Sequence, residues 1–403
     1  MKRRILVMPD GNWLAHTSRA FEIAKVLREM GYEVLFAGEG AYMKLPKEEG
    51  FQVLPIKTLP PERMLSVSRR SRVNWYNYNL IKTLVGAELI LFDQLKPDLV
   101  LSDYRLSLST SCELANIPLA AILNASWTNY SSVRIKAPEH LIYSKIFGRR
   151  LVTIFAPTIK KLILTFDARP IKKFRLEKGL SPRKNVFDFW RGDFNIITDI
   201  PEYGPTKNLP GNYHYIGPIV WEPEIELPDW LEKLDPNKTT LYFTMGSTGN
   251  PHIFEQAIEI FGNTEYQCVM TTAGLIELSN IPENFFVVNY APGSKIMEKC
   301  DMVICQGGNG TIYQALQNGV PIIGIPTMHD QEFNLDQVEK LGVGIKLSEL
   351  KFKPKNLTTA VKLILNREHF KANALDLKKI LGEYDASQTG AKLISSYLSS
   401  IHS

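Results

Sequence analysis

One segment in the last third of the chain reads Gln306-Gly307-Gly308-Asn309-Gly310-Thr311, directly after the apolar run Met302–Cys305. The apolar run predicts a buried strand, the glycines predict a tight turn, and a helix is expected to begin at Thr311. Glycines let backbone N–H groups approach a ligand closely, and a helix N-terminus favours negative charge. The segment therefore predicts a diphosphate site, although it matches neither the GxxxxGK[ST] P-loop nor the GxGxxG dinucleotide motif.

Short apolar runs alternate with helical patterns on both sides of this segment. The clearest predicted strands are Arg4–Met8, Glu33–Ala37, Asp98–Ser102, Leu119–Leu123, Phe194–Thr198, Leu241–Met245 and Pro321–Ile325. This alternation predicts parallel sheets covered by helices on both faces. A single core rarely grows past about 250–300 residues. The 403 residues are therefore expected to form two Rossmann-like, doubly wound α/β domains that face each other across a cleft.

The domain boundary is predicted in the acidic, proline-containing stretch Trp221–Pro228, which has the composition of a linker. Residues 1–219 are expected to form an N-terminal domain and residues 220–384 a C-terminal domain. A last helix over residues 385–403 is expected to pack back on the N-terminal domain.

Charge is unevenly distributed along the chain. The net charge is +5, but residues 131–184 contain 14 Lys and Arg and three acidic residues, a local charge of +11. Apolar residues interleave with these basic ones, a mixture that is typical of segments lying in an anionic membrane surface. An ordinary solvated basic face with a buried apolar stripe is the alternative. Nucleic-acid binding is not expected, because no known binding module accompanies the basic stretch.

The chain carries no pattern of export or membrane spanning. Its first apolar run ends at Pro9 and Asp10, whereas a signal peptide needs roughly 7–15 apolar residues. There is no run of about 20 apolar residues that would span a bilayer. The four cysteines form no CxxC pair and are expected to be reduced thiols. We expect a cytoplasmic protein, peripheral on the inner face of the membrane if the basic stretch binds lipid.

The glycine turn is followed by Gly319-Val320-Pro321, Asp330-Gln331 and Asn334. Together these spacings resemble the donor-binding signature of the family 1 glycosyltransferases. Members of that family have the GT-B fold and take sugars from UDP- or dTDP-activated donors. The resemblance is specific over the last third of the chain and weaker over the N-terminal half.

The resemblance implies a role for each matching residue of the donor site. The residues implied to bind the diphosphate are Ser247, Thr248, Gln306, Gly308, Asn309, Gly310 and Thr311. Tyr290 and Ala291 match the segment that stacks on the nucleobase, and Gln314 matches the residue that bonds the ribose. Asp330 and Gln331 match the pair that bonds sugar hydroxyls.

Two positions of this donor site depart from the family pattern. The family usually has His where this chain has Gln306 and Glu where it has Gln314. An amide bonds a ribose hydroxyl more weakly than a carboxylate does, so Gln314→Glu is expected to tighten UDP binding.

His16 and Asp103 are the candidate catalytic residues. His16 is expected in the loop after the first strand, and Asp103 follows the strand Asp98–Ser102, so both are expected at carboxyl ends of strands. An Asp that bonds one ring nitrogen fixes the tautomer and supports the imidazolium formed at the other. In the resembled family a His here is the general base and an Asp orients it, although Arg19 replaces a usual Pro. Because no Asp-x-Asp or metal-ligand spacing occurs, no metal or other cofactor is expected.

The acceptor site is the least defined part of this prediction. Trp75, Tyr78 and Trp127 lie where this fold usually builds its acceptor pocket. The reaction implied is an inverting transfer to a hydroxyl of a lipid, a lipophilic alcohol or another small molecule. Two alternatives remain: a catalytically silent, sugar-nucleotide-binding partner of another enzyme, and a UDP-sugar epimerase on the same fold.

Overall fold

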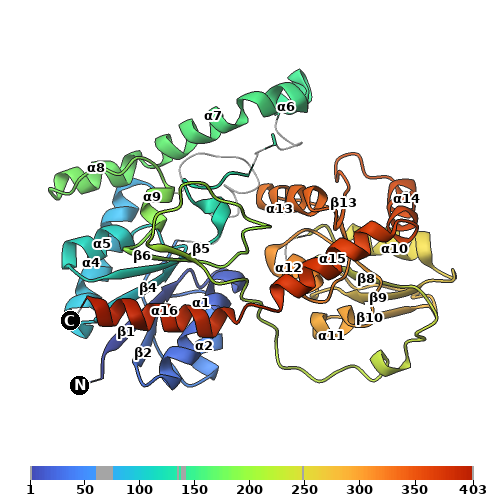
Figure 1. Cartoon of the computed structure of the whole chain (residues 1–403), viewed down its shortest axis with the longest axis horizontal. Helices are drawn as coiled ribbons and strands as arrows, with labels where there is room; N and C mark the ends of the chain where they lie inside the picture. Colours follow the sequence, from blue (N-terminus) through green and yellow to red (C-terminus); the bar gives the residue numbers. More distant parts are fainter. Residues whose placement is uncertain (1, 60–75, 134–135, 138–141, 247–248, 402–403) are drawn as a thin grey trace. The chain divides into compact units, whose positions relative to one another are not determined.

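The computed structural model describes the whole chain except residues 1, 60–75, 134–135, 138–141, 247–248 and 402–403 (Figure 1). The chain divides into two compact units. The first comprises Met1–Arg134, Phe155–Trp221 and Tyr384–Ser403, and the second comprises Ile135–Ile154 and Glu222–Glu383. The sequence had assigned the segment Ile135–Ile154 to the first domain, whereas its contacts group it with the second.

A parallel sheet of seven strands, in the order β3-β2-β1-β4-β5-β6-β7, forms the centre of the first unit. Its strands are β1 (Arg4–Pro9), β2 (Glu33–Ala37), β3 (Gln52–Leu54), β4 (Leu99–Asp103), β5 (Leu119–Leu123), β6 (Phe194–Ile197) and β7 (Tyr213–Tyr215). Strands β4 and β5 are buried along their whole length. These strands read as nearly continuous apolar runs because helices cover both faces of the sheet.

The helices of this half are α1 (Leu14–Glu29), α2 (Lys44–Glu48), α4 (Tyr78–Leu95), α5 (Leu108–Ala115), α8 (Arg169–Glu177), α9 (Phe187–Trp190) and α16 (Ala386–Ser400). Alternate residues of β1 pack on opposite faces of the sheet. Ile5 and Val7 join a cluster with α1 and α16, whereas Leu6 and Met8 join one with α4 and α5. The last helix, α16, lies along α1, where the Tyr32 hydroxyl is 2.7 Å from that of Ser395.

The second unit is built on a parallel sheet of six strands, in the order β10-β9-β8-β11-β12-β13. Its strands are β8 (Thr240–Thr244), β9 (Gln267–Thr271), β10 (Phe285–Val288), β11 (Met302–Cys305), β12 (Ile322–Gly324) and β13 (Gly344–Lys346). Its helices are α10 (His252–Phe261), α11 (Gly293–Met297), α12 (Asn309–Gln317), α13 (His329–Lys340), α14 (Pro354–Leu365) and α15 (Glu368–Leu381). The strand orders confirm the doubly wound α/β fold in both halves of the chain.

In each sheet the strand order reverses beside the first strand, between β1 and β4 and between β8 and β11. Ligands of doubly wound sheets bind at this switch point, outside the carboxyl ends of the strands. The loops after β1, β4, β8 and β11 are therefore where functional residues are expected.

Much of the described part of the basic segment is helical. It contains α6 (Ile142–Phe147), α7 (Arg149–Asp167) and α8, and α7 continues through Pro157. Within the described parts of the chain, no helix is both long and apolar enough to cross a membrane.

Candidate active site

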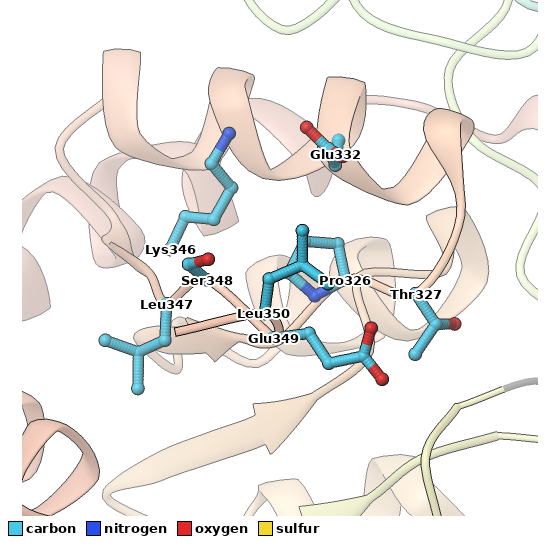
Figure 2. Close-up of a pocket in the computed structure, with 8 residues that line it drawn as sticks. All are labelled: Pro326, Thr327, Glu332, Lys346, Leu347, Ser348, Glu349 and Leu350. Carbon is cyan, nitrogen blue, oxygen red and sulfur yellow. The ribbon is translucent and has the colours of Figure 1, made fainter. Parts of the chain in front are cut away.

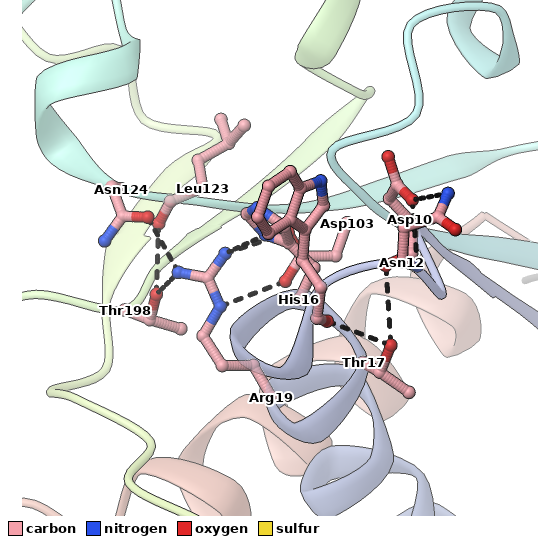
Figure 3. Close-up of polar contacts among 10 residues, drawn as sticks. Asp10, Asn12, His16, Thr17, Arg19, Asp103, Leu123, Asn124 and Thr198 are labelled. Atoms are coloured by element: carbon pink, nitrogen blue, oxygen red, sulfur yellow. Dashed lines mark hydrogen bonds and ion pairs between the residues drawn. The ribbon is translucent and has the colours of Figure 1, made fainter. Parts of the chain in front are cut away.

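His16 and Asp103 meet at the switch point of the first sheet. Pro9 of β1 is paired with Asp103 of β4, and the N–H of Asp10 donates to the carbonyl oxygen of Asp103 at 3.0 Å. His16 lies in the first turn of α1 and not in the preceding loop, because the turn at residues 10–13 is short and the helix begins at Leu14. From there its Nδ1 lies 2.8 Å from Oδ1 of the fully buried Asp103 (Figure 3). Among the described residues, the polar contacts of the ring, with Asp103 and with Arg19, both involve Nδ1, which leaves Nε2 as the nitrogen that can accept a proton.

Arg19, one turn further along α1, makes a second contact with the same carboxylate. Its Nε donates to Oδ2 of Asp103 at 3.0 Å, and one terminal nitrogen donates to Oδ1 at 2.8 Å. The other terminal nitrogen donates to Asn124 Oδ1 and Thr198 Oγ1, both at 2.8 Å. In the sequence Arg19 is only a departure from the family pattern. Its neighbours along the chain do not indicate that its side chain reaches the ends of three strands.

Aromatic rings surround His16. The ring of Tyr104 stacks on the imidazole with centroids 4.5 Å apart and an interplanar angle of 2°. Trp127 lies 4.7 Å from Tyr104 and 5.5 Å from His16, and Trp190 lies 4.8 Å from Tyr104. Tyr104 has φ of 64°, a left-handed conformation that costs a non-glycine residue about 1–2 kcal/mol. Such strain beside a buried carboxylate is typical of a functional site.

Of the three candidate acceptor residues, the structure describes Tyr78 and Trp127, whose rings contact different aromatic side chains. Trp127 belongs to the aromatic cluster at His16. Tyr78 begins α4, where its ring contacts Phe174 and its hydroxyl donates to the Glu177 carboxylate. Trp75 lies outside the described residues.

Asp10 is a second buried carboxyl group beside His16, and sequence reasoning missed it. Burial raises its pKa, while the nearby His16 and the two N–H donors of Asn12 oppose that rise. Asp10 also lines a small pocket together with Tyr76, Tyr104 and Arg105. In the sequence, Asp10 stands in a run of turn-forming residues after the first strand. Such a run does not show whether an Asp belongs to a functional site or only forms the turn.

The glycine turn of the second unit leaves a helix N-terminus open. After β11 the chain turns at Gly307, whose φ is 89° and where a Cβ would lie 2.6 Å from Leu335. Helix α12 begins at Asn309, two residues earlier than expected. A Cβ at Gly310 would meet nothing within 4 Å, so a ligand can approach the N–H groups of this first turn.

Gln306 links this turn to the loop after β8. Its side chain is buried against Gly246, where a Cβ would lie 2.2 Å from Nε2, and its Oε1 has no hydrogen-bond partner among the described residues. Gln306 thus joins the two loops that flank the switch point of the second sheet. Ser247 and Thr248, the next residues of the β8 loop, lie outside the described residues.

Gln314 has a carboxylate beside it. Its Nε2 donates to Glu222 Oε1 at 3.4 Å, and Glu222 also accepts from the backbone N–H of Ser294 at 2.8 Å and from the Ser294 hydroxyl. Glu222 was missed because its surroundings in the sequence read as a linker. Tyr290 is two-thirds exposed, and its hydroxyl donates to the Ala273 carbonyl; Ala291 follows it in the loop before α11.

Asp330 and Gln331 lie in the first turn of α13. The Gln331 side chain is buried, and its Oε1 accepts from the backbone N–H groups of Thr327 and Met328 at 2.9 and 3.2 Å. Gln331 therefore caps the helix, a contact that the sequence pattern did not suggest. A pocket beside α13 is lined by Thr327, Glu332, Lys346 and Ser348 among others, but not by Asp330 or Gln331 (Figure 2).

Neither thiol chemistry nor a metal cluster stands out in the described structure. All four cysteines are free and buried, and burial raises the pKa of the Cys305 thiol to about 12. Across the described ranges, His, Cys, Asp and Glu side chains form no group of three or more that could hold a metal ion.

Two doubly wound α/β domains with polar loops at each switch point are the architecture of the GT-B fold. Residues 258–387 match the family model of the erythromycin biosynthesis protein CIII-like C-terminal domain. The chain is 33% identical over 385 residues to the PGL/p-HBAD biosynthesis glycosyltransferase of Mycobacterium tuberculosis (strain ATCC 25177 / H37Ra), covering 94% of this chain and 89% of the relative.

One further relative and one solved structure extend the likeness. The PGL/p-HBAD biosynthesis rhamnosyltransferase of Mycobacterium bovis (strain BCG / Pasteur 1173P2) is 33% identical over 383 residues, 94% of this chain and 85% of the relative. The spinosyn rhamnosyltransferase SpnG, solved with thymidine diphosphate, shares the fold with a TM-score of 0.72 and 17% identity, over 98% and 99% of the two chains. The chain belongs to the family 1 glycosyltransferases and is a glycosyltransferase.

Proposed function

We propose that the protein is an inverting transferase that moves a sugar from a UDP- or dTDP-sugar to a hydroxyl group of a lipophilic acceptor. The contact between His16 Nδ1 and Asp103 carries this proposal. With Nδ1 bonded to the carboxylate, Nε2 takes the proton of the acceptor hydroxyl. The acceptor oxygen forms a bond to the anomeric carbon as the bond to the nucleoside diphosphate breaks, and one displacement inverts that carbon.

The donor is proposed to bind at the first turn of α12. The backbone N–H groups from Gly308 to Thr311 and the positive end of the helix dipole would meet the charge of the departing diphosphate. These donors supply the charge compensation, so the proposed reaction uses no metal. The thymidine diphosphate of SpnG and the rhamnosyl specificity in the M. bovis relative's name favour a dTDP-activated donor and a rhamnosyl group.

A lipophilic acceptor is favoured by the outer surface of α7. Large apolar side chains recur there at spacings of three and four residues, which place them on one face of the helix. We call this the apolar face of α7; its exposed members are Leu151, Ile154, Phe155, Ile159, Leu162, Ile163 and Phe166. All are 41–65% exposed, whereas the opposite face carries the buried Ala156 and Asp167. Soluble helices normally show the reverse arrangement, so an exposed apolar face of this size is typical of an interaction surface.

Basic side chains beside this face favour an anionic membrane as its partner. Arg150, Lys161 and Arg169 are exposed. Two basic residues of the same segment point elsewhere: the Lys160 ammonium lies 5.1 Å from the Phe187 ring, and Arg149 donates to the Ala137 carbonyl at 2.8 Å. We propose that the apolar face of α7 enters the headgroup region while the exposed cations meet lipid phosphates, which makes the protein peripheral to the membrane.

The second candidate is a silent sugar-nucleotide-binding partner of another enzyme. It is favoured by Gln306 and Gln314, which replace family residues, and opposed by the complete His16–Asp103 contact.

A donor and acceptor screen tests the proposal. UDP- and dTDP-sugars are incubated with hydroxylated acceptors, soluble or held in phosphatidylglycerol vesicles, and nucleoside diphosphate release is measured. We expect release that depends on both a particular donor and an acceptor. Nucleotide binding by calorimetry without acceptor-dependent release from any donor would favour the silent partner instead.

A further inference from the structure

Arg19 is a buried cation of the first unit, 5% exposed, and it lies against His16. We propose that Arg19 is a positioning residue that holds Asp103 in the orientation that keeps Nδ1 of His16 protonated and Nε2 able to accept a proton. The inference rests on the role proposed for His16 and adds a second residue that sets the state of the base.

The Arg19–Asp103 contact fixes the plane of the carboxylate. Nε and one terminal nitrogen of Arg19 bond different oxygens of Asp103, at 3.0 and 2.8 Å. A single hydrogen bond leaves a carboxylate able to turn about its broad terminal torsion, whereas a planar two-point contact does not. With Arg19 in place, Oδ1 is held 2.8 Å from His16 Nδ1.

Arg19 is itself anchored, so it can act as a support. Its remaining terminal nitrogen donates to Asn124, directly after β5, and to Thr198, directly after β6. The side chain thus connects α1 to the carboxyl ends of β4, β5 and β6. A binding or catalytic group held in this way by packed, hydrogen-bonded neighbours is preorganised.

The contact at Nδ1 restricts the tautomer. One terminal nitrogen of Arg19 lies 3.1 Å from His16 Nδ1 and also donates to Asp103 Oδ1 at 2.8 Å. Arginine carries donors only, so Nδ1 either accepts from Arg19 or donates to Asp103. The carboxylate is the closer group and accepts charge-assisted bonds from both, which favours a proton on Nδ1. The positive charge of Arg19 beside the imidazole is balanced by the Asp103 carboxylate.

The tautomer can be measured without any substrate. The chain has seven histidines, and loss of one set of signals in His16→Gln assigns His16 in ¹⁵N-detected spectra of the ring nitrogens. At about pH 8, where an ordinary imidazole is neutral, we expect the full-length protein to show His16 with Nδ1 protonated and Nε2 unprotonated. In Arg19→Met we expect a mixture of tautomers, and in Arg19→Lys a smaller change in the same direction, because Lys cannot bond both oxygens.

The matched control is Arg28→Met, on the same helix, where the arginine is exposed and pairs with Glu49. It should leave the His16 signals unchanged. A wild-type tautomer pattern in folded Arg19→Met would overturn the inference. If Arg19→Met does not fold, a wild-type pattern in Arg19→Lys would overturn it in the same way.

The kinetic test follows once a donor and acceptor are known. Arg19→Lys and Arg19→Met should lower kcat by about 10- to 100-fold, the cost of a misplaced catalytic group, with the donor KM changed less than about twofold. An equal loss in Arg28→Met, or a rise in KM with unchanged kcat, would contradict a positioning role. Since the spectra require no turnover, a failure of the proposed function leaves the tautomer result readable.

Discussion

His16 is held by a carboxylate on one edge and by an aromatic ring on one face. Asp103 fixes Nδ1, and Tyr104 stacks on the imidazole at 4.5 Å. Tyr104 adopts its left-handed conformation directly after the strand that supplies Asp103. One short segment, the end of β4 and the residue after it, thus supplies both the carboxylate and the stacked ring that contact His16.

Replacing the proposed base is the first prediction. His16→Ala should lower kcat by about 10²–10⁴-fold, since general base catalysis contributes that much, while nucleotide affinity stays nearly unchanged. Turnover and calorimetry measure the two effects. His252→Ala is the control, because His252 is exposed and its ring pairs with the neighbouring Glu255 on α10. Near-normal turnover of His16→Ala would remove His16 from the mechanism.

Lys160 carries a pH-dependent prediction. Burial against Phe187 lowers the pKa of its ammonium to about 8. Below about pH 8 Lys160 is charged in both the folded and the unfolded chain, and the cost of burying that charge destabilises the folded state in full. Between about pH 8 and the ordinary lysine value near 10.4, the unfolded chain holds more protons than the folded one, so the free energy of unfolding rises with pH. Lys160→Met should raise the free energy of unfolding at pH 7, and the gain should shrink as pH rises above about 8.

Denaturant unfolding at several pH values measures this difference, with Lys161→Met as the control because Lys161 is exposed. An increase in the free energy of unfolding that does not change with pH, or that is equal in both variants, would show that Lys160 is not buried as a cation.

Among the elements, α7 departs most from the soluble pattern. The sequence predicted a mixture of basic and apolar residues in this region but not which side chains face outwards. The structure turns Arg149 and Lys160 towards other residues and leaves the apolar side chains exposed. Contacts outside the helix separate these groups, since Lys160 lies against Phe187 of α9 and Arg149 donates to Ala137.

Vesicle flotation tests the apolar face of α7. The unmodified protein should float with phosphatidylglycerol vesicles and not with neutral phosphatidylcholine vesicles. Each engaged cation is worth about 1 kcal/mol, and attraction should weaken as salt shortens the Debye length from about 10 Å at 0.1 M to 3 Å at 1 M. Arg150→Glu with Lys161→Glu and Arg169→Glu should abolish flotation.

Phe155→Ser with Leu162→Ser should weaken flotation with the anionic vesicles, because fewer apolar side chains enter the headgroup region. The control is Lys355→Glu with Lys362→Glu, which reverses two exposed charges on α14. Equal behaviour of the unmodified protein on anionic and neutral vesicles would remove the support for a lipid acceptor.

The contact between Glu222 and Gln314 changes an expectation drawn from the sequence. Gln314→Glu alone was expected to tighten UDP binding, but it would place two carboxylates together at the present 3.4 Å contact. We now expect repulsion to turn this side chain away from Glu222 and from the ribose, which should weaken UDP or dTDP binding by about 1 kcal/mol, the order of one lost hydrogen bond. The exchanged pair Glu222→Gln with Gln314→Glu should bind as the unmodified protein does. Calorimetry showing tighter binding for Gln314→Glu alone would mean that Glu222 does not govern this position.

Over the whole molecule, the sequence predicts the features that depend on local pattern. Alternating apolar runs and helical patterns predicted both sheets, and strand-end placement predicted that His16 and Asp103 meet, although 87 residues separate them. Arg19, Tyr104 and Glu222 could not be predicted in the same way. Arg19 bonds Thr198 across 179 residues, and Gln314 bonds Glu222 across 92. Such contacts depend on how far each side chain reaches once the sheet is assembled, which periodicity does not encode.

The anomeric configuration of the product tests the central claim most directly. The donor identified by the screen, labelled with ¹³C at the anomeric carbon, is turned over by the full-length protein with its acceptor. The one-bond carbon–proton coupling of that carbon then gives its configuration in donor and product. A single displacement promoted by His16 predicts the opposite configuration in the product. A product that retains the configuration of the donor would contradict the account.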